Sequence, residues 1–137
     1  MEAVAQVPGG DSFTRRQADQ IRHGIAAARA ETGLHFSVYI GPAEGDVRAF
    51  AQRLHSSLGA TAQTSVLTLV DPEQRRVEIV TGEIARRRID DRAAGLVTLS
   101  MATSFAGGDL AGGVVNGLRM MAQSAARPRV LHEHEAE

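Results

Sequence analysis

The sequence predicts an α/β domain with a small mixed sheet of three to four strands and helices on both faces. The first observation is the order of periodicities along the chain, which reads helix–strand–helix–strand–strand–helix–helix. The second is the almost wholly apolar run at residues 66–70, which is typical of a central strand covered on both sides. A helix between the first two strands predicts a right-handed crossover, so we expect these two strands to be parallel.

The first helix is expected at residues 15–32. Thr14 and Gln17 form a capping box before it, and Gly33 supplies the left-handed residue that ends it. One helical face is apolar or small, and its members are Ala18, Ile21, Ile25, Ala28 and Thr32. Residues 36–40 then alternate with period two, which predicts a strand covered mainly on one face.

Asp46 is placed to cap a second helix that ends at Gly59. Its apolar stripe consists of Val47, Phe50, Ala51, Leu54 and Leu58. This stripe puts His55 on the exposed side of the helix.

A hairpin should follow, with residues 77–80 antiparallel to residues 66–70. Asp71 opens its turn, and Pro72 occupies the second position, which proline favours. Asp90 or Asp91 caps a third helix, whose inner face is expected to hold Ala94, Val97, Met101 and Phe105. Asp109 caps a fourth, lined by Leu110, Val114, Leu118 and Met121.

These elements place the domain at residues 13–126, between a flexible lead at residues 1–12 and a disordered acidic tail at residues 127–137. The amino terminus has acidic Glu2 where a signal peptide carries positive charge. No apolar run reaches the roughly 18 residues that a membrane span needs. We therefore expect a cytoplasmic protein without a membrane span.

Composition excludes several classes of function. The net charge of −1 gives no field that attracts nucleic acid, although all 15 basic residues are arginine. Without cysteine there is no thiolate nucleophile or thiolate metal site. The histidines lack the helical spacing of a zinc site, and the glycines lack the spacing of a phosphate-binding loop. No serine nucleophile elbow occurs.

Three segments carry a family resemblance. They are residues 31–34, which enter the first strand, the hairpin at residues 66–82, and Phe-Ala-Gly-Gly-Asp-Leu-Ala-Gly-Gly at residues 105–113. In this order and spacing, residues 14–125 resemble the TPM domain family. They look closest to a bacterial branch of unknown function without the usual secretion signal.

The resemblance implies either weak acid phosphatase activity or binding of calcium or a similar cation. The family's acidic site lies where the second strand starts and the third ends. Asp91 matches a family aspartate, and Glu83 and Asp90 lie near it as residual metal ligands. At the start of the second strand, however, the sequence has Gln-Thr-Ser instead of the family's acid and Asn-Gly. Arg86 falls where the family has a glutamate.

Calcium takes six to eight oxygen ligands, which one matching aspartate beside arginines does not supply. We therefore expect a degenerate site and no cofactor, with calcium or another divalent cation as the alternative. Asp91 is interpreted either as a metal ligand or as a helix cap. Arg86, Arg87 and Arg88 either bind an anion or a partner's carboxylates, or form a solvated charge run paired with neighbouring acids.

Three functions stay open from the sequence. The first is a non-catalytic interaction or regulatory module with a protein partner. The second is a weak divalent-metal-dependent phosphatase with Asp91 and Glu83 as ligands, or a calcium-binding domain. The third is a scaffold that self-associates as a homo-oligomer through the glycine-rich fourth helix.

Overall fold

The computed structural model describes residues 14–126. Its elements are α1 (Arg15–Thr32), β1 (His35–Ile40), α2 (Val47–Ser56), the 3₁₀ turn η1 (Gly59–Thr64), β2 (Ser65–Asp71), β3 (Arg76–Thr81), the 3₁₀ turn η2 (Ala85–Arg87), α3 (Asp91–Ala106) and α4 (Leu110–Ala126). The expected lead at residues 1–12 and tail at residues 127–137 lie outside the described residues.

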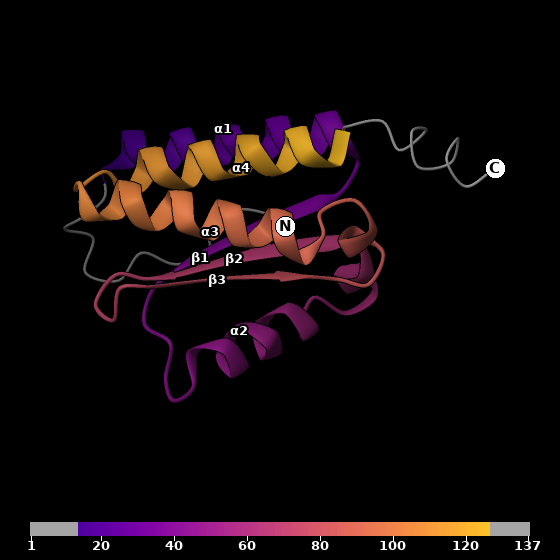
Figure 1. The fold of residues 1–137 in the computed structure, drawn as a ribbon, viewed down its shortest axis with the longest axis horizontal. Coiled ribbons are helices and arrows are strands. Elements are labelled where there is room, and N and C mark those ends of the chain that lie inside the picture. The colour runs from indigo at the N-terminus through magenta and orange to yellow at the C-terminus, as the bar shows by residue number, and fades with distance from the viewer. Residues whose placement is uncertain (1–13, 127–137) are drawn as a thin grey trace.

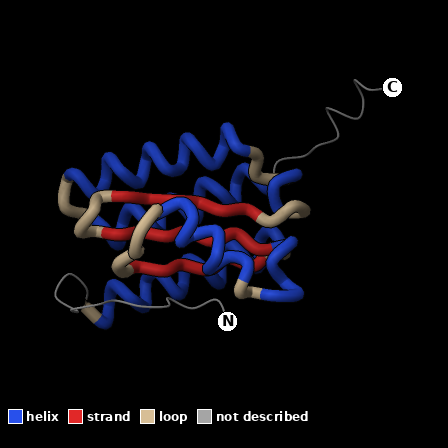
Figure 2. Tube along the Cα trace, turned by 90° about the horizontal axis from the view of Figure 1, so that it is seen from below, coloured by secondary structure: helices blue, strands red, loops and turns tan. Residues whose placement is uncertain are grey.

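The sheet has three strands in the order β1-β2-β3, with β1 and β2 parallel and β2 and β3 antiparallel. This confirms the predicted mixed sheet. Helices α1, α4 and α3 form a layer on one face, and α2 covers the other (Figure 1). Figure 2 shows the sheet from the side of α2, with the three strands side by side behind that helix.

The central strand explains how two cores form. Every residue of β2 is buried, as its apolar run predicts. Val66 and Val70 pack into the core under α1, α3 and α4, whereas Leu67 and Leu69 pack against the apolar face of α2. The alternation of side chains along a strand therefore assigns successive residues of β2 to opposite layers.

The signals at the ends of the first helix are confirmed. The Thr14 side chain accepts from the Gln17 backbone amide at 3.1 Å, and the Gln17 side chain accepts from the Thr14 amide at 2.9 Å. Gly33 adopts the left-handed conformation at φ 79° and ends α1. Local sequence is sufficient here because each cap is made within a few residues.

Two glycines of α4, Gly113 and Gly117, lie in the interior of the helical layer. A Cβ on Gly113 would come within 2.8 Å of the Phe105 ring, and a Cβ on Gly117 would overlap the side chain of Met101. These glycines therefore let α3 pack closely on α4. At Gly113 and Gly117 this face of α4 is therefore occupied by α3. Homo-oligomer formation stays a prediction.

Of the helices that the structure describes, none combines the length and apolar character required to cross a bilayer.

Candidate functional site

The residues that the sequence singled out meet at one end of the molecule, where β2 begins and β3 ends. Two segments form this surface, residues 60–65, mostly in η1, and residues 82–88, which include η2. We call it the arginine pole. The sequence did not predict that both segments form 3₁₀ turns.

Gly82 joins the two segments. Its backbone amide donates to the carbonyl of Ser65 at 2.9 Å, and the amide of Ile84 donates to the carbonyl of Gln63 at 3.0 Å. A Cβ at Gly82 would overlap the carbonyl oxygens of Ala62 and Gln63. Only glycine permits this close approach of the two backbones, so the geometry of the pole is set by residue 82.

Arg88 does not face the solvent with its neighbours. Its guanidinium donates from Nη1 to the carbonyl of Thr32 at 3.0 Å, and from Nε and Nη2 to the carbonyl of Ala125 at 3.3 and 3.1 Å. These carbonyls belong to the last turns of α1 and α4, where backbone acceptors lack helical partners and the helix dipole favours a cation. Arg88 therefore joins the ends of two helices, a role that the sequence did not predict. Binding of an anion or partner by Arg86, Arg87 and Arg88 stays a prediction.

Arg86 and Arg87 are exposed on η2. One nitrogen of Arg86 lies 3.5 Å from the Thr81 carbonyl, a contact at the limit of a hydrogen bond. None of the ion pairs formed within residues 14–126 includes either arginine, so the expected pairing with Glu83, Asp90 and Asp91 is not formed. Two exposed arginines thus occupy consecutive positions of a short turn.

The three acids proposed as residual metal ligands, Glu83, Asp90 and Asp91, each have a different structural position. Asp90 is the N-cap of α3, and its Oδ1 accepts from the Ala93 amide at 2.9 Å. Asp91 is the first residue of that helix, and Glu83 is exposed on the loop after β3. In the part of the chain that the structure describes, no three histidine or acidic side chains gather closely enough to hold a metal ion.

His55 was predicted on the exposed side of α2, but it is buried and contacts Ser65 of the arginine pole. His55 is only 8% exposed, and its Nε2 lies 3.1 Å from the carbonyl of Ser65. Because a carbonyl can only accept, Nε2 carries the proton in this contact. The buried face of α2 follows Val47, Ala51 and His55. The spacing of four residues between these positions could have indicated that His55 is buried, but the broader apolar stripe of the helix pointed to a different face.

Asp71 forms a second polar centre at the opposite end of β2. Its carboxylate is 1% exposed and accepts from the amides of Ala43, Glu73 and Gln74 at 2.9, 3.1 and 3.2 Å, and from Gln74 Nε2 at 2.6 Å. Burial alone would raise the pKa of Asp71, but these hydrogen bonds stabilise the ionised form and outweigh the effect of burial. The pKa of Asp71 therefore lies below its usual value. The ionised carboxylate ties the loop after β1 to the β-hairpin.

The architecture is that of a three-layer α/β domain, and comparison with known proteins gives its family. The family model described as "Domain of unknown function (DUF5130)" matches residues 2–122. The chain belongs to this family.

Two curated relatives come from Mycobacterium tuberculosis, the uncharacterized proteins MT2543 of strain CDC 1551 and Rv2468c of strain H37Rv. Each is 28% identical over 93 residues, which are 68% of this chain and 55% of the relative. The chain therefore spans about half the length of the curated relatives it matches.

Solved structures share the fold. The BA42 protein of Bizionia argentinensis has a TM-score of 0.75 at 20% identity, over 83% of this chain and 81% of that one. The N-terminal domain of a protein from P. gingivalis has a TM-score of 0.73 at 19% identity, over 85% of this chain and 78% of that one. The N-terminal domain of cg2496 from Corynebacterium glutamicum has a TM-score of 0.71 at 15% identity, over 91% of this chain and 88% of that one. At these identities the likeness shows the fold alone.

Proposed function

We propose that this domain is a non-catalytic interaction module and that its arginine pole binds an acidic segment of a protein partner. The observation that carries the proposal is that the three arginines at residues 86–88 make different contacts. Arg88 is committed to the ends of α1 and α4, while Arg86 and Arg87 are exposed and take part in no ion pair within the described chain. We further propose that the domain is related to the TPM family, as the sequence motifs indicate.

The chemistry of the pole suits a carboxylate-rich ligand. A guanidinium group binds a carboxylate through two parallel hydrogen bonds. Ile84, which is 37% exposed, adds an apolar contact within the same segment. Each exposed ion pair contributes only up to about 1 kcal/mol, so useful affinity requires a partner with several acids and an apolar residue.

A calcium site at this end is disfavoured by the same residues. The carbonyl ends of α1 and α4 would attract a cation, but the guanidinium of Arg88 is already hydrogen-bonded to them. Arg86 and Arg87 add positive charge beside Glu83, and Asp90 is engaged as a helix cap. We therefore propose that the pole takes anions and that no divalent cofactor is needed. A cytoplasmic location stays a prediction.

The experiment measures binding of a fluorescent peptide with six glutamates around a central leucine. Wild-type protein should raise the anisotropy of the peptide in a salt-sensitive manner. The double variant Arg86→Gln/Arg87→Gln should bind about tenfold more weakly, since two exposed charge contacts are lost. The matched control is Arg15→Gln/Arg16→Gln, which removes the same charge at the start of α1, the end of that helix remote from the pole.

Equal binding by the wild type and the Arg86/Arg87 variant would refute the proposal. Phosphatase activity of the same protein is assayed in parallel with a chromogenic phosphate ester, with and without a chelator. Turnover that is abolished both by the chelator and by Asp91→Ala would replace the interaction module with the metal-dependent phosphatase. Asp91 is the residue to change because it carries the resemblance to the family site.

A further inference from the structure

The outward face of α3 is apolar and exposed. Leu96 and Leu99 are 57% and 65% exposed, more than any other large hydrophobic residue that the structure describes. Around them the exposed residues of the same face are small or uncharged: Gly95, Ala102, Thr103 and Ala106. Residues 93–106 contain no charged side chain, so this helix offers solvent none of the charges that normally cover an outer face.

The inner face of α3 is already packed. Val97 and Met101 are buried against the core beside α4, which lies between α1 and α3 in Figure 1. Positions 92, 96, 99, 103 and 106 form a second stripe with the alternating spacing of four and three residues that is typical of helix–helix pairing. A helix that is apolar on both sides is expected to be covered on both sides.

We propose that α3 pairs with α3 of a second copy of this chain, antiparallel and about a two-fold axis near Leu99. The face is complementary to itself in that arrangement. With Leu99 at the axis, Leu96 lies opposite Ala102 of the second copy, and Gly95 lies opposite Thr103. Large residues thus meet small ones, as close packing of helices requires.

Charge favours the antiparallel direction. Arg92 lies on the stripe in the first turn of α3, and the exposed Asp109 follows the other end of that helix. An antiparallel pair brings each Arg92 toward Asp109 and the carbonyl end of α3 in the second copy, where a cation is favourable. A parallel pair would instead place each Arg92 beside its own equivalent.

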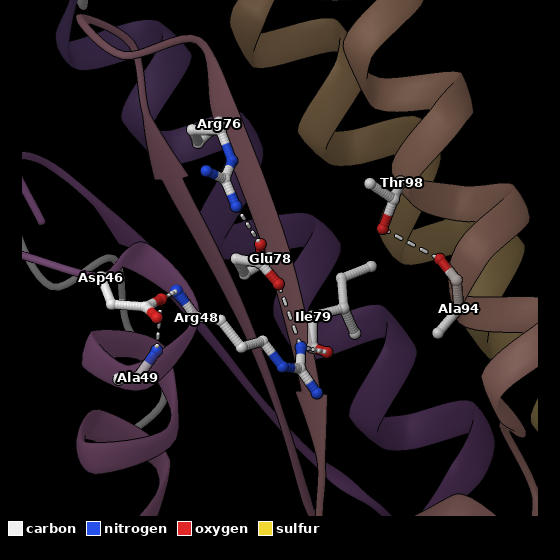
Figure 3. A network of polar contacts seen from close by, with 8 residues as sticks. All are labelled: Asp46, Arg48, Ala49, Arg76, Glu78, Ile79, Ala94 and Thr98. Atoms are coloured by element: carbon white, nitrogen blue, oxygen red, sulfur yellow. Dashed lines mark hydrogen bonds and ion pairs between the residues drawn. The ribbon is translucent and has the colours of Figure 1, made fainter.

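The neighbouring sheet edge is closed to strand pairing. Arg48 reaches from α2 to the outer edge of β3, where Nη1 donates to the Ile79 carbonyl at 2.9 Å and to Glu78 at 3.1 Å. Arg76 pairs with the other oxygen of Glu78 at 2.8 Å (Figure 3). Charged side chains on an edge strand oppose edge-to-edge association. Strand pairing at the edge of β3 is therefore opposed, whereas residues 93–106 of α3 carry no such charges.

Sedimentation velocity tests the proposal on the full chain. The contact is small, so we expect a dissociation constant on the order of 100 µM and a clear dimer at about 1 mM. Leu96→Glu/Leu99→Glu should weaken association at least about tenfold, because the two introduced carboxylates would bring negative charge into the contact between the helices. Gln52→Glu/Ser56→Glu adds the same two charges to the exposed side of α2 and should leave association unchanged.

Cross-linking locates the axis. The chain has no cysteine, so Leu99→Cys introduces a single thiol. A residue at a two-fold axis meets its own equivalent, and mild oxidation should therefore join Leu99→Cys chains much faster than Gln52→Cys chains. A wild-type protein that stays monomeric at about 1 mM would overturn the proposal, because the face would then be covered by something other than a second copy. A dimer that persists in Leu96→Glu/Leu99→Glu, or equal cross-linking of the two cysteine variants, would also overturn it.

Discussion

The guanidinium of Arg88 donates two hydrogen bonds to the carbonyl of Ala125, 37 residues away in the sequence, at 3.3 and 3.1 Å. A third bond reaches Thr32 at the end of α1. One side chain therefore joins the ends of two helices to the loop after β3. This relationship separates Arg88 from Arg86 and Arg87, which the sequence presents as one run.

Replacing Arg88 should cost stability. Arg88→Met retains the aliphatic stem but leaves the terminal carbonyls of α1 and α4 without their donor. We expect a loss of about 2 kcal/mol in the free energy of unfolding, measured by urea denaturation. Arg87→Met, on the exposed side of η2, should lose less than about 0.5 kcal/mol. Equal effects of the two variants would contradict the role assigned to Arg88.

Gly82→Ala should destabilise the protein by more than about 2 kcal/mol, because the added Cβ would overlap the carbonyls of η1. Gly95→Ala is the matched control, since nothing lies within 4 Å of a Cβ there. That change should stabilise α3 by roughly 0.5–1 kcal/mol through helix propensity. Both variants are measured by thermal unfolding at low concentration, where self-association does not contribute.

Thr68 offers a stabilising substitution. Its hydroxyl is buried in β2 and has no hydrogen-bond partner among the described residues. Thr68→Val keeps the shape and removes the unsatisfied group, so the free energy of unfolding should rise by about 1 kcal/mol. Thr98→Val is the comparison, because that hydroxyl donates to the Ala94 carbonyl at 3.0 Å and its loss should give no gain. A destabilised Thr68→Val protein would show that the hydroxyl has a partner.

Asp71 makes stability depend on pH. Its pKa is lowered in the folded protein, so its contribution is complete above the unfolded value of about 3.9 and is lost as the pH falls through the folded value. Asp71→Asn should be less stable than the wild type by about 2 kcal/mol at neutral pH. The difference should shrink below about pH 4. Chemical denaturation across this range measures it, and a difference independent of pH would contradict the ionised, hydrogen-bonded carboxylate.

The sequence predicted most of the fold because its signals are local. Thr14 with Gln17, and Gly33, mark the ends of α1 without any distant partner. The apolar run of β2 and the turn after Asp71 likewise define the hairpin within a few residues.

The site was predicted less well because its geometry depends on distant partners. Nothing near Arg88 indicates that the ends of α1 and α4 will lie beside it. His55 was placed outside because the hydrogen bond to Ser65 crosses from one element to the next. The sequence did not identify which residues contact the glycines of α4, and the structure packs Phe105 and Met101 of α3 against Gly113 and Gly117.

The proposed role of the arginine pole is tested most directly by two-dimensional amide NMR of the full chain, titrated separately with the glutamate-rich peptide and with calcium chloride. The peptide should shift the amides of residues 60–65 and 82–88, the shifts should vanish in Arg86→Gln/Arg87→Gln, and calcium should leave these amides in place. Saturable calcium shifts at Glu83, Asp90 and Asp91, with no response to the peptide, would contradict it.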